Sequence, residues 1–139
     1  MFQYFEYIVK LADNSIDTDD IPVGAVVVKD NKIIGEGWNT REKDNFILGH
    51  AEINAIKMAS NNLNCWNLSD CELYVTLKPC SMCYEVIKQS RIKNVFYLLE
   101  KPNNKKEFYK TNFNLVTYED LKLKYETKLK VFFKKLRDK

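Results

Sequence analysis

The chain has 139 residues, 45% of them hydrophobic, and a formal net charge of +3. This length supports one domain with its own hydrophobic core and is too short for two domains that each have one. No apolar run approaches the ~20 residues that a membrane helix needs, and residues 1–11 mix charged with aromatic side chains instead of forming the apolar segment of a signal peptide. We therefore expect a single cytoplasmic domain, residues 1–139, without a membrane span.

The first predicted elements are a helix and a β-hairpin. Apolar residues recur at helical spacing over residues 2–13, and the Asp-, Asn- and Ser-rich stretch 13–20 predicts a loop. The apolar run 23–28 predicts a buried strand. Asp30-Asn31 favours a turn and 32–38 predicts a second strand, so these two strands form a hairpin.

Helices and strands alternate through the rest of the chain. A polar loop at 39–45 precedes a helix that begins at about residue 50 and ends at the breaker pair Asn61-Asn62. The later elements are a strand at 72–77, a helix opened by Pro79, a strand at 94–99, a loop at 101–106, a short strand near 115–117 and a basic helix at about 118–137. This order predicts an α/β fold, a three-layer α/β/α sandwich with a five-stranded mixed sheet.

Charge is unevenly distributed along the chain. Residues 1–100 carry 10 Lys+Arg and 14 Asp+Glu, whereas residues 101–139 carry 12 and 5, giving net charges of −4 and +7. A basic end on an acidic body suggests a polyanionic partner such as RNA. The alternative is a merely solvated, lysine-rich helix face.

Four residues form a candidate metal and catalytic group. The only histidine, His50, begins a His-Ala-Glu motif at a predicted helix start, and Cys80 and Cys83 lie in the first turn of a later helix. At this spacing the two cysteines project from one side, and free amide groups there favour thiolates. Two thiolates and an imidazole suit Zn²⁺ and leave a fourth position for water. Glu52 can then move protons between that water and a substrate.

Each of these signals is weak alone. A Cys-x-x-Cys pair can be redox-active or structural, and a single histidine can be a packed or surface residue. Together, the His-x-Glu and Pro-Cys-x-x-Cys motifs match the signature of zinc-dependent nucleobase deaminases. Cys65 and Cys71 have no such spacing, and we expect both to be small buried residues.

Segments beyond these motifs resemble the bacterial tRNA adenosine deaminase family of the cytidine deaminase-like superfamily. The similar segments are 21–28, 34–39, 50–53, 73–77, 79–83, 91–92 and 132–137. The resemblance implies a cytidine deaminase-like fold and a homodimer that converts the wobble adenosine of a tRNA anticodon stem-loop to inosine. It implies one zinc per chain on His50, Cys80 and Cys83, with Glu52 as the catalytic residue.

The resemblance also gives roles to residues outside the metal group. It implies that Asn39 hydrogen-bonds the base, although an asparagine also favours a turn at the end of a strand. It implies that the C-terminal helix packs on the domain and reaches the RNA.

Three positions depart from the family pattern. Lys78 stands where the family usually has Glu, and we expect its positive charge to favour thiolate and hydroxide without abolishing activity. Residues 84–86 replace small residues of the following helix, which alters its packing at a subunit contact. Residues 98–106 replace a Gly- and Lys-rich substrate loop with another basic segment.

Two other functions remain open at this point. One is deamination of a free nucleobase or nucleoside, such as cytosine, guanine or cytidine, although a small substrate does not need a basic tail. The other is a non-catalytic, zinc-stabilised RNA-binding module with Cys65 or Cys71 as a fourth ligand. Glu52 has no purpose in that module.

Overall fold

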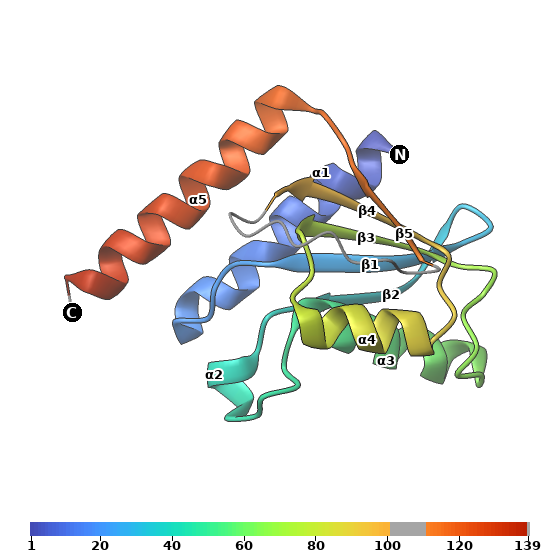
Figure 1. Cartoon of the computed structure of the whole chain (residues 1–139). Coiled ribbons are helices and arrows are strands. Elements are labelled where there is room, and N and C mark those ends of the chain that lie inside the picture. The colour runs from blue at the N-terminus through green and yellow to red at the C-terminus, as the bar shows by residue number, and fades with distance from the viewer. Residues whose placement is uncertain (101–110, 139) are drawn as a thin grey trace.

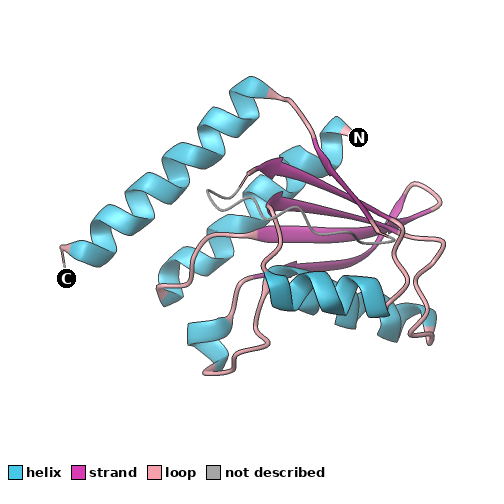
Figure 2. Ribbon diagram, in the orientation of Figure 1, coloured by secondary structure: helices cyan, strands magenta, loops and turns pink. Residues whose placement is uncertain are grey.

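A computed structural model describes residues 1–100 and 111–138 of the chain. A five-stranded mixed sheet lies between two layers of helices, as Figures 1 and 2 show. The strands are β1 (Gly24–Lys29), β2 (Lys32–Trp38), β3 (Glu72–Leu77), β4 (Asn94–Leu99) and β5 (Asn112–Leu115). The helices are α1 (Phe2–Leu11), the 3-10 helix η1 (Ala12–Thr18), α2 (Arg41–Asp44), α3 (Ala51–Leu63), α4 (Ser81–Gln89) and α5 (Glu119–Arg137). The predicted α/β/α sandwich is therefore confirmed.

The strand order β2-β1-β3-β4-β5 determines where the chain can build a site. Strand β1 is antiparallel to β2 and to β3, whereas β3, β4 and β5 run parallel. Consequently the end of β2, the start of β1 and the ends of β3 and β4 lie at the same end of the sheet, which we call the shared edge. The β1–β2 hairpin turns at Asp30 and Asn31, which both have positive φ, as a tight hairpin turn requires.

Alternating side chains of the strands supply two cores, one on each face of the sheet. Ala25 and Val27 of β1 pack in the core under α3 and α4, and the intervening Val26 packs under α1 and α5. Successive side chains of a strand point to opposite faces of the sheet. Because helices cover both faces, residues 25–28 of β1 are all buried in one core or the other, and this run is apolar throughout.

Helix α3 lies very close to β2 because two glycines of the strand leave room for it. A Cβ atom on Gly37 would lie 2.4 Å from the Ala51 carbonyl oxygen, and one on Gly35 would lie 2.3 Å from the Ala55 carbonyl oxygen. These glycines therefore fix the depth at which the N-terminus of α3 sits against the sheet edge.

Helix α5 crosses the opposite face of the sheet, above α1 in Figure 1. Its buried residues are Leu121, Tyr125 and Phe132, and the Tyr125 hydroxyl donates a hydrogen bond of 2.8 Å to the Pro22 carbonyl oxygen. The basic residues of its last turns, Lys134, Lys135 and Arg137, are exposed. No helix within residues 1–100 and 111–138 is long and apolar enough to span a bilayer.

Several predicted boundaries were wrong. Residues 12–18 form η1 instead of a loop, because short polar side chains there hydrogen-bond nearby backbone and favour a tight turn. Residues 41–44 of the expected loop form α2. Helix α3 continues through the predicted breaker pair and ends at Leu63, where the C-cap residue Asn64 has the left-handed conformation.

The fifth strand is also displaced from its predicted position. It covers Asn112–Leu115 instead of 115–117, since pairing with β4 begins at Asn112 opposite Asn94. The loop predicted at 101–106 lies outside the described residues.

Candidate metal centre

Two helix N-termini meet at the shared sheet edge and carry the candidate ligands. His50 is the N-cap residue of α3, and Cys80 is the N-cap residue of α4. Cys83 follows in the first turn of α4 and is fully buried. The convergence of strand ends at this edge thus brings together residues that are 30 positions apart in the sequence.

The donor atoms have the spacing of a tetrahedral metal site. The His50 Nδ1 atom lies 3.6 Å from the Cys80 Sγ atom and 3.4 Å from the Cys83 Sγ atom. Zinc–nitrogen and zinc–sulfur bonds of normal length, at the tetrahedral angle, separate such atoms by about 3.5 Å. These are the only three His, Cys, Asp or Glu residues, within the part of the chain that the structure describes, whose donor atoms gather closely enough to hold a metal ion.

The pKa values of the three donor side chains reflect the same contacts. A hydrogen bond from Cys83 lowers the pKa of Cys80 to about 3, with a further contribution from His50. The pKa of Cys83 is raised by that hydrogen bond and by burial. The pKa of His50 is raised by its hydrogen bond to Cys80, against the effect of burial. One thiolate is therefore already favoured before a metal binds.

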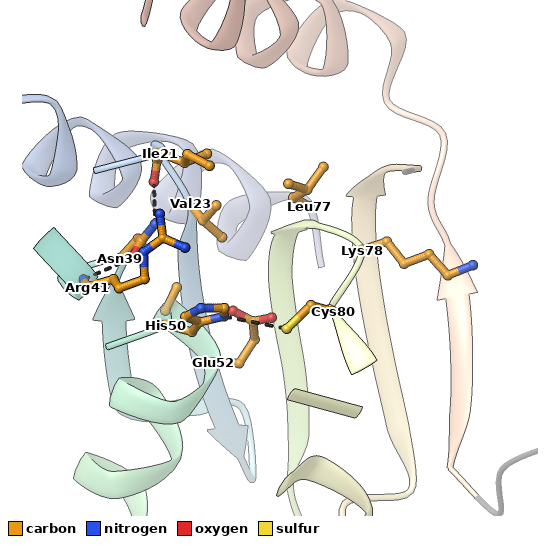
Figure 3. A pocket seen from close by; sticks show the side chains of 10 residues that line it. Ile21, Val23, Asn39, Arg41, His50, Glu52, Leu77, Lys78 and Cys80 are labelled. Atoms are coloured by element: carbon orange, nitrogen blue, oxygen red, sulfur yellow. Dashed lines mark hydrogen bonds between the residues drawn. The ribbon is translucent and has the colours of Figure 1, made fainter. Parts of the chain in front are cut away.

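Glu52 lies beside this group but is not part of the metal cluster. Its side chain is 4% exposed, and burial raises the pKa of its carboxyl group. Figure 3 shows the carboxylate facing the same pocket as His50 and Cys80. A buried carboxyl beside a candidate metal site has the placement of a proton-transfer group.

The pocket is lined by two of the three donors, His50 and Cys80, and has an apolar wall. Its lining residues are Ile21, Val23, Asn39, Arg41, His50, Ala51, Glu52, Leu77, Lys78 and Cys80. Ile21, Arg41 and Leu77 were missed by the sequence analysis as pocket residues. The position of Arg41 two residues after Asn39 was the only sequence signal that could have indicated it.

The side chain of Asn39 bonds to the backbone around the pocket. Its Nδ2 atom donates to the Ile21 carbonyl oxygen over 3.1 Å, and its Oδ1 atom accepts from the Arg41 N–H over 3.1 Å. Asn39 therefore holds the end of β2 to two other pocket segments, as a turn residue does. The amide group keeps further bonding capacity, because Nδ2 has two hydrogens and Oδ1 two lone pairs.

Asp20 is a second supporting residue that the sequence did not single out. It is 1% exposed, and its carboxylate accepts hydrogen bonds from the N–H groups of Glu42 and Lys43. These are first-turn amides of α2, so Asp20 caps the short helix that carries Arg41.

Lys78 is paired with an acidic residue. Its Nζ atom lies 2.7 Å from a Glu100 carboxylate oxygen, which raises the pKa of Lys78. Burial alone would raise the pKa of Glu100, but hydrogen bonds from Lys78 and Tyr97 lower it. In Figure 3 the lysine side chain points away from His50 and Glu52.

The two remaining cysteines stay away from the metal group. Cys71 is buried, as expected, but Cys65 is exposed, so the prediction for Cys65 was wrong. It lies in the loop after α3, where no periodic pattern distinguishes an inward from an outward side chain. The cluster of metal donors includes neither residue, which removes the fourth ligand that a closed structural site requires.

Comparisons with known proteins agree with this arrangement. Residues 2–99 match the family model described as the cytidine and deoxycytidylate deaminase zinc-binding region. A tRNA-specific adenosine deaminase of Streptococcus pyogenes serotype M18 is 42% identical over 94 residues, which cover 68% of this chain and 59% of that protein. The chain thus spans about three fifths of the length of this relative.

Solved structures of two kinds of deaminase have a similar fold. One comes from a study of A-to-I editing by tRNA:A34 deaminases, with a TM-score of 0.75 and 28% identity, covering 83% of this chain and 98% of that one. The other is a guanine deaminase from Bacillus subtilis, with a TM-score of 0.66 and 29% identity, covering 91% of this chain and 92% of that one.

Proposed function

Because the chain belongs to the family of cytidine and deoxycytidylate deaminase zinc-binding regions, we propose that it converts the wobble adenosine of a tRNA anticodon to inosine. The observation that carries the chemistry is that His50, Cys80 and Cys83 meet beside buried Glu52, at a pocket lined by His50, Glu52 and Cys80. The substrate class rests on the tRNA-specific relatives and on the basic C-terminal helix.

In this proposal His50, Cys80 and Cys83 are the ligands of one zinc ion. Zinc held by three protein ligands supplies an activated water, because it keeps a fourth position open and lowers the pKa of that water to about 7. The three side chains would hold the ion beside the pocket that Asn39 and Glu52 line.

Glu52 is the proton carrier of the proposed reaction. Its carboxylate accepts a proton from the attacking water and delivers it to N1 of the purine ring. It then carries the proton of the new C6 hydroxyl group to the amino group, which leaves as ammonia while the C6 carbonyl of inosine forms. Burial suits this role, since the raised pKa of the carboxyl favours keeping the proton between the two transfers.

The remaining pocket residues bind and shield the base. Ile21, Val23 and Leu77 provide an apolar wall that limits water around the purine. We assign Asn39 a hydrogen bond to the base in addition to its backbone bonds, which agrees with its place in the pocket lining and its spare donor.

RNA binding is assigned to the basic end of the chain. Lys134, Lys135 and Arg137 are exposed on α5, and that helix is anchored near the pocket by the bond from Tyr125 to Pro22. We propose the same role for Lys105 and Lys106, which lie outside the described residues. A flexible anticodon loop can place its base in the pocket while phosphates meet these cations.

A free-base deaminase is the second candidate. The guanine deaminase structure supports it, with an identity close to that of the tRNA deaminase structure. The same zinc ligands and Glu52 would serve both reactions. The tRNA-specific relatives and the basic end of the chain favour RNA as the substrate. The third candidate, a zinc-stabilised binding module, is disfavoured because neither Cys65 nor Cys71 joins the metal cluster and because it leaves Glu52 without a role.

We further propose that the protein acts as a homodimer in the cytoplasm. Three consecutive apolar residues near the pocket, Phe46, Ile47 and Leu48, are exposed by 55%, 61% and 38%, and a second copy would cover them. Light scattering of the purified chain tests the dimer.

The proposed reaction is tested in cells that overproduce the chain. Total tRNA is sequenced, and adenosine read as guanosine at a wobble position is expected only with the wild-type chain and not with Glu52→Ala. Unchanged wobble adenosine in both would contradict the assignment.

A further inference from the structure

The turn that carries Cys80 is tied to the end of β4 through both the main chain and the side chain of Lys78. The Lys78 N–H donates to the Leu99 carbonyl oxygen over 2.9 Å, and the Nζ atom lies 2.7 Å from Glu100. The next residue, Pro79, has no N–H to donate. Lys78 is therefore a principal link between this turn and the neighbouring strand.

Glu100 is held from two sides. The Tyr97 hydroxyl donates a 2.7 Å hydrogen bond to the carboxylate, and the Lys78 Nζ atom lies 5.9 Å from the centre of the Tyr97 ring. The side chains of Lys78 and Glu100 are only 17% and 32% exposed. An ion pair that is partly withdrawn from water and held by a third group constrains geometry better than an exposed pair does.

Tyr84 extends this cluster to α4, the helix that carries Cys83. Its hydroxyl forms a hydrogen bond with Lys78, and its ring packs 4.0 Å from the ring of Phe113 in β5. The cluster of Lys78, Tyr84, Tyr97 and Glu100 thus joins β4 and α4 around the two cysteines. It also connects residues from all three positions that depart from the family pattern.

We propose that this cluster is a clamp that positions Cys80 and Cys83 for metal binding, with Lys78 as a positioning residue. The inference rests on the zinc site proposed above. Without the ion pair, the turn before Cys80 samples more conformations, and closing the metal site costs more conformational entropy. Changes to groups that support metal ligands typically lower metal affinity or activity by about 10–100-fold.

Charge exchange tests the clamp without any substrate. Zinc affinity of the full chain is measured by competition with a chromogenic chelator for wild type, Lys78→Glu, Glu100→Lys and the double exchange. We expect each single variant to bind zinc about tenfold more weakly, since each places like charges together. The double variant restores the opposite charges and should recover most of the affinity.

The controls separate the clamp from general effects of charge. Lys128→Glu breaks another ion pair, with Asp13 on η1, and should leave zinc affinity unchanged. Lys78→Gln keeps much of the side-chain stem and serves if the charge reversals do not fold. Cobalt substitution adds a spectroscopic readout, because the thiolate–cobalt bands report the geometry at both cysteines.

Three results would overturn the proposal. In the first, Lys78→Gln and the single reversals retain wild-type zinc affinity and cobalt spectra, so the clamp is absent while the zinc site stands. In the second, the wild-type chain binds no zinc, and the proposed function falls together with the clamp. A double variant no better than the single ones would likewise show that the charge pair does not position the turn.

Discussion

The Nδ1 atom of His50 and the Sγ atom of Cys83 lie 3.4 Å apart although 33 positions separate them in the sequence. Two helices that begin at the same edge of the sheet create this contact. The metal site is consequently a property of the tertiary fold, and its ligands can be tested one by one.

The first prediction concerns zinc content. The purified chain should hold about one zinc, because three protein ligands and a water complete a catalytic site. Cys80→Ser and Cys83→Ser should lose the metal, whereas Cys65→Ser and Cys71→Ser should keep it, as atomic absorption will measure. Zinc loss in either of the last two would favour a closed, structural site.

The second prediction separates metal binding from proton transfer. Glu52→Ala should retain zinc and lose at least the ~10²–10⁴-fold in kcat that is typical of a general acid and base. Glu52→Gln is the matched control for shape, and it should be equally inactive because an amide cannot carry the proton. Turnover close to wild type in either variant would remove Glu52 from the mechanism.

The third prediction tests the two roles of Asn39. Asn39→Ala should lower the free energy of unfolding by about 1–3 kcal/mol, since it removes two partly buried hydrogen bonds, to the backbone of Ile21 and of Arg41. Asn39→Asp keeps the acceptor for Arg41 and should raise KM with a smaller loss of stability. If KM of the aspartate variant equals that of wild type, base recognition by this side chain is wrong.

The fourth prediction concerns the packing that sets the depth of α3. Gly37→Ala forces a methyl group against the Ala51 carbonyl oxygen and should destabilise the chain by about 1–3 kcal/mol, as overpacking does. It should also impair zinc binding, because His50 begins the displaced helix. Thermal unfolding checks the first effect, and Lys32→Ala on the exposed part of β2 is the control. Unaltered stability would contradict the close packing.

The sequence was sufficient to predict the cluster of His50, Cys80 and Cys83 and most of the sheet. Strands 32–38, 72–77 and 94–99 were predicted with the observed bounds, since their alternating or continuous apolar patterns reflect burial on one or both faces. The three candidate metal donors were predicted because two short motifs fall at helix starts. Short stretches of sequence are therefore enough to indicate both the burial of a strand and the positions of the candidate metal donors.

Contacts between distant segments could not be predicted in the same way. The pairing of Lys78 with Glu100 depends on the parallel register of β3 and β4, and nothing local to either residue encodes it. The register of β5 likewise depends on its partner strand. Cys65 illustrates a third case, because a loop residue without periodicity gives no signal of its exposure.

The fifth prediction concerns RNA binding through the end of α5. Neutralising Lys134, Lys135 and Arg137 together to Gln should weaken binding of an anticodon stem-loop. The slope of log affinity against log salt should fall by roughly two to three units if each cation pairs with one phosphate. Fluorescence anisotropy at several salt concentrations measures both effects.

The control for that variant removes three exposed lysines from other elements, namely Lys10, Lys32 and Lys57. The control should have a salt slope close to that of wild type. An equal loss in both variants would mean that RNA binding depends only on total charge and not on α5.

Turnover of competing substrates is the most direct test of the proposed function. The zinc-loaded chain is given an anticodon stem-loop with a wobble adenosine and, separately, free guanine, cytosine and adenosine, and ammonia release is followed for each. We expect kcat/KM to be substantial for the stem-loop and negligible for the small molecules. Efficient turnover of free guanine with none of the stem-loop would contradict the tRNA assignment and leave a free-base deaminase.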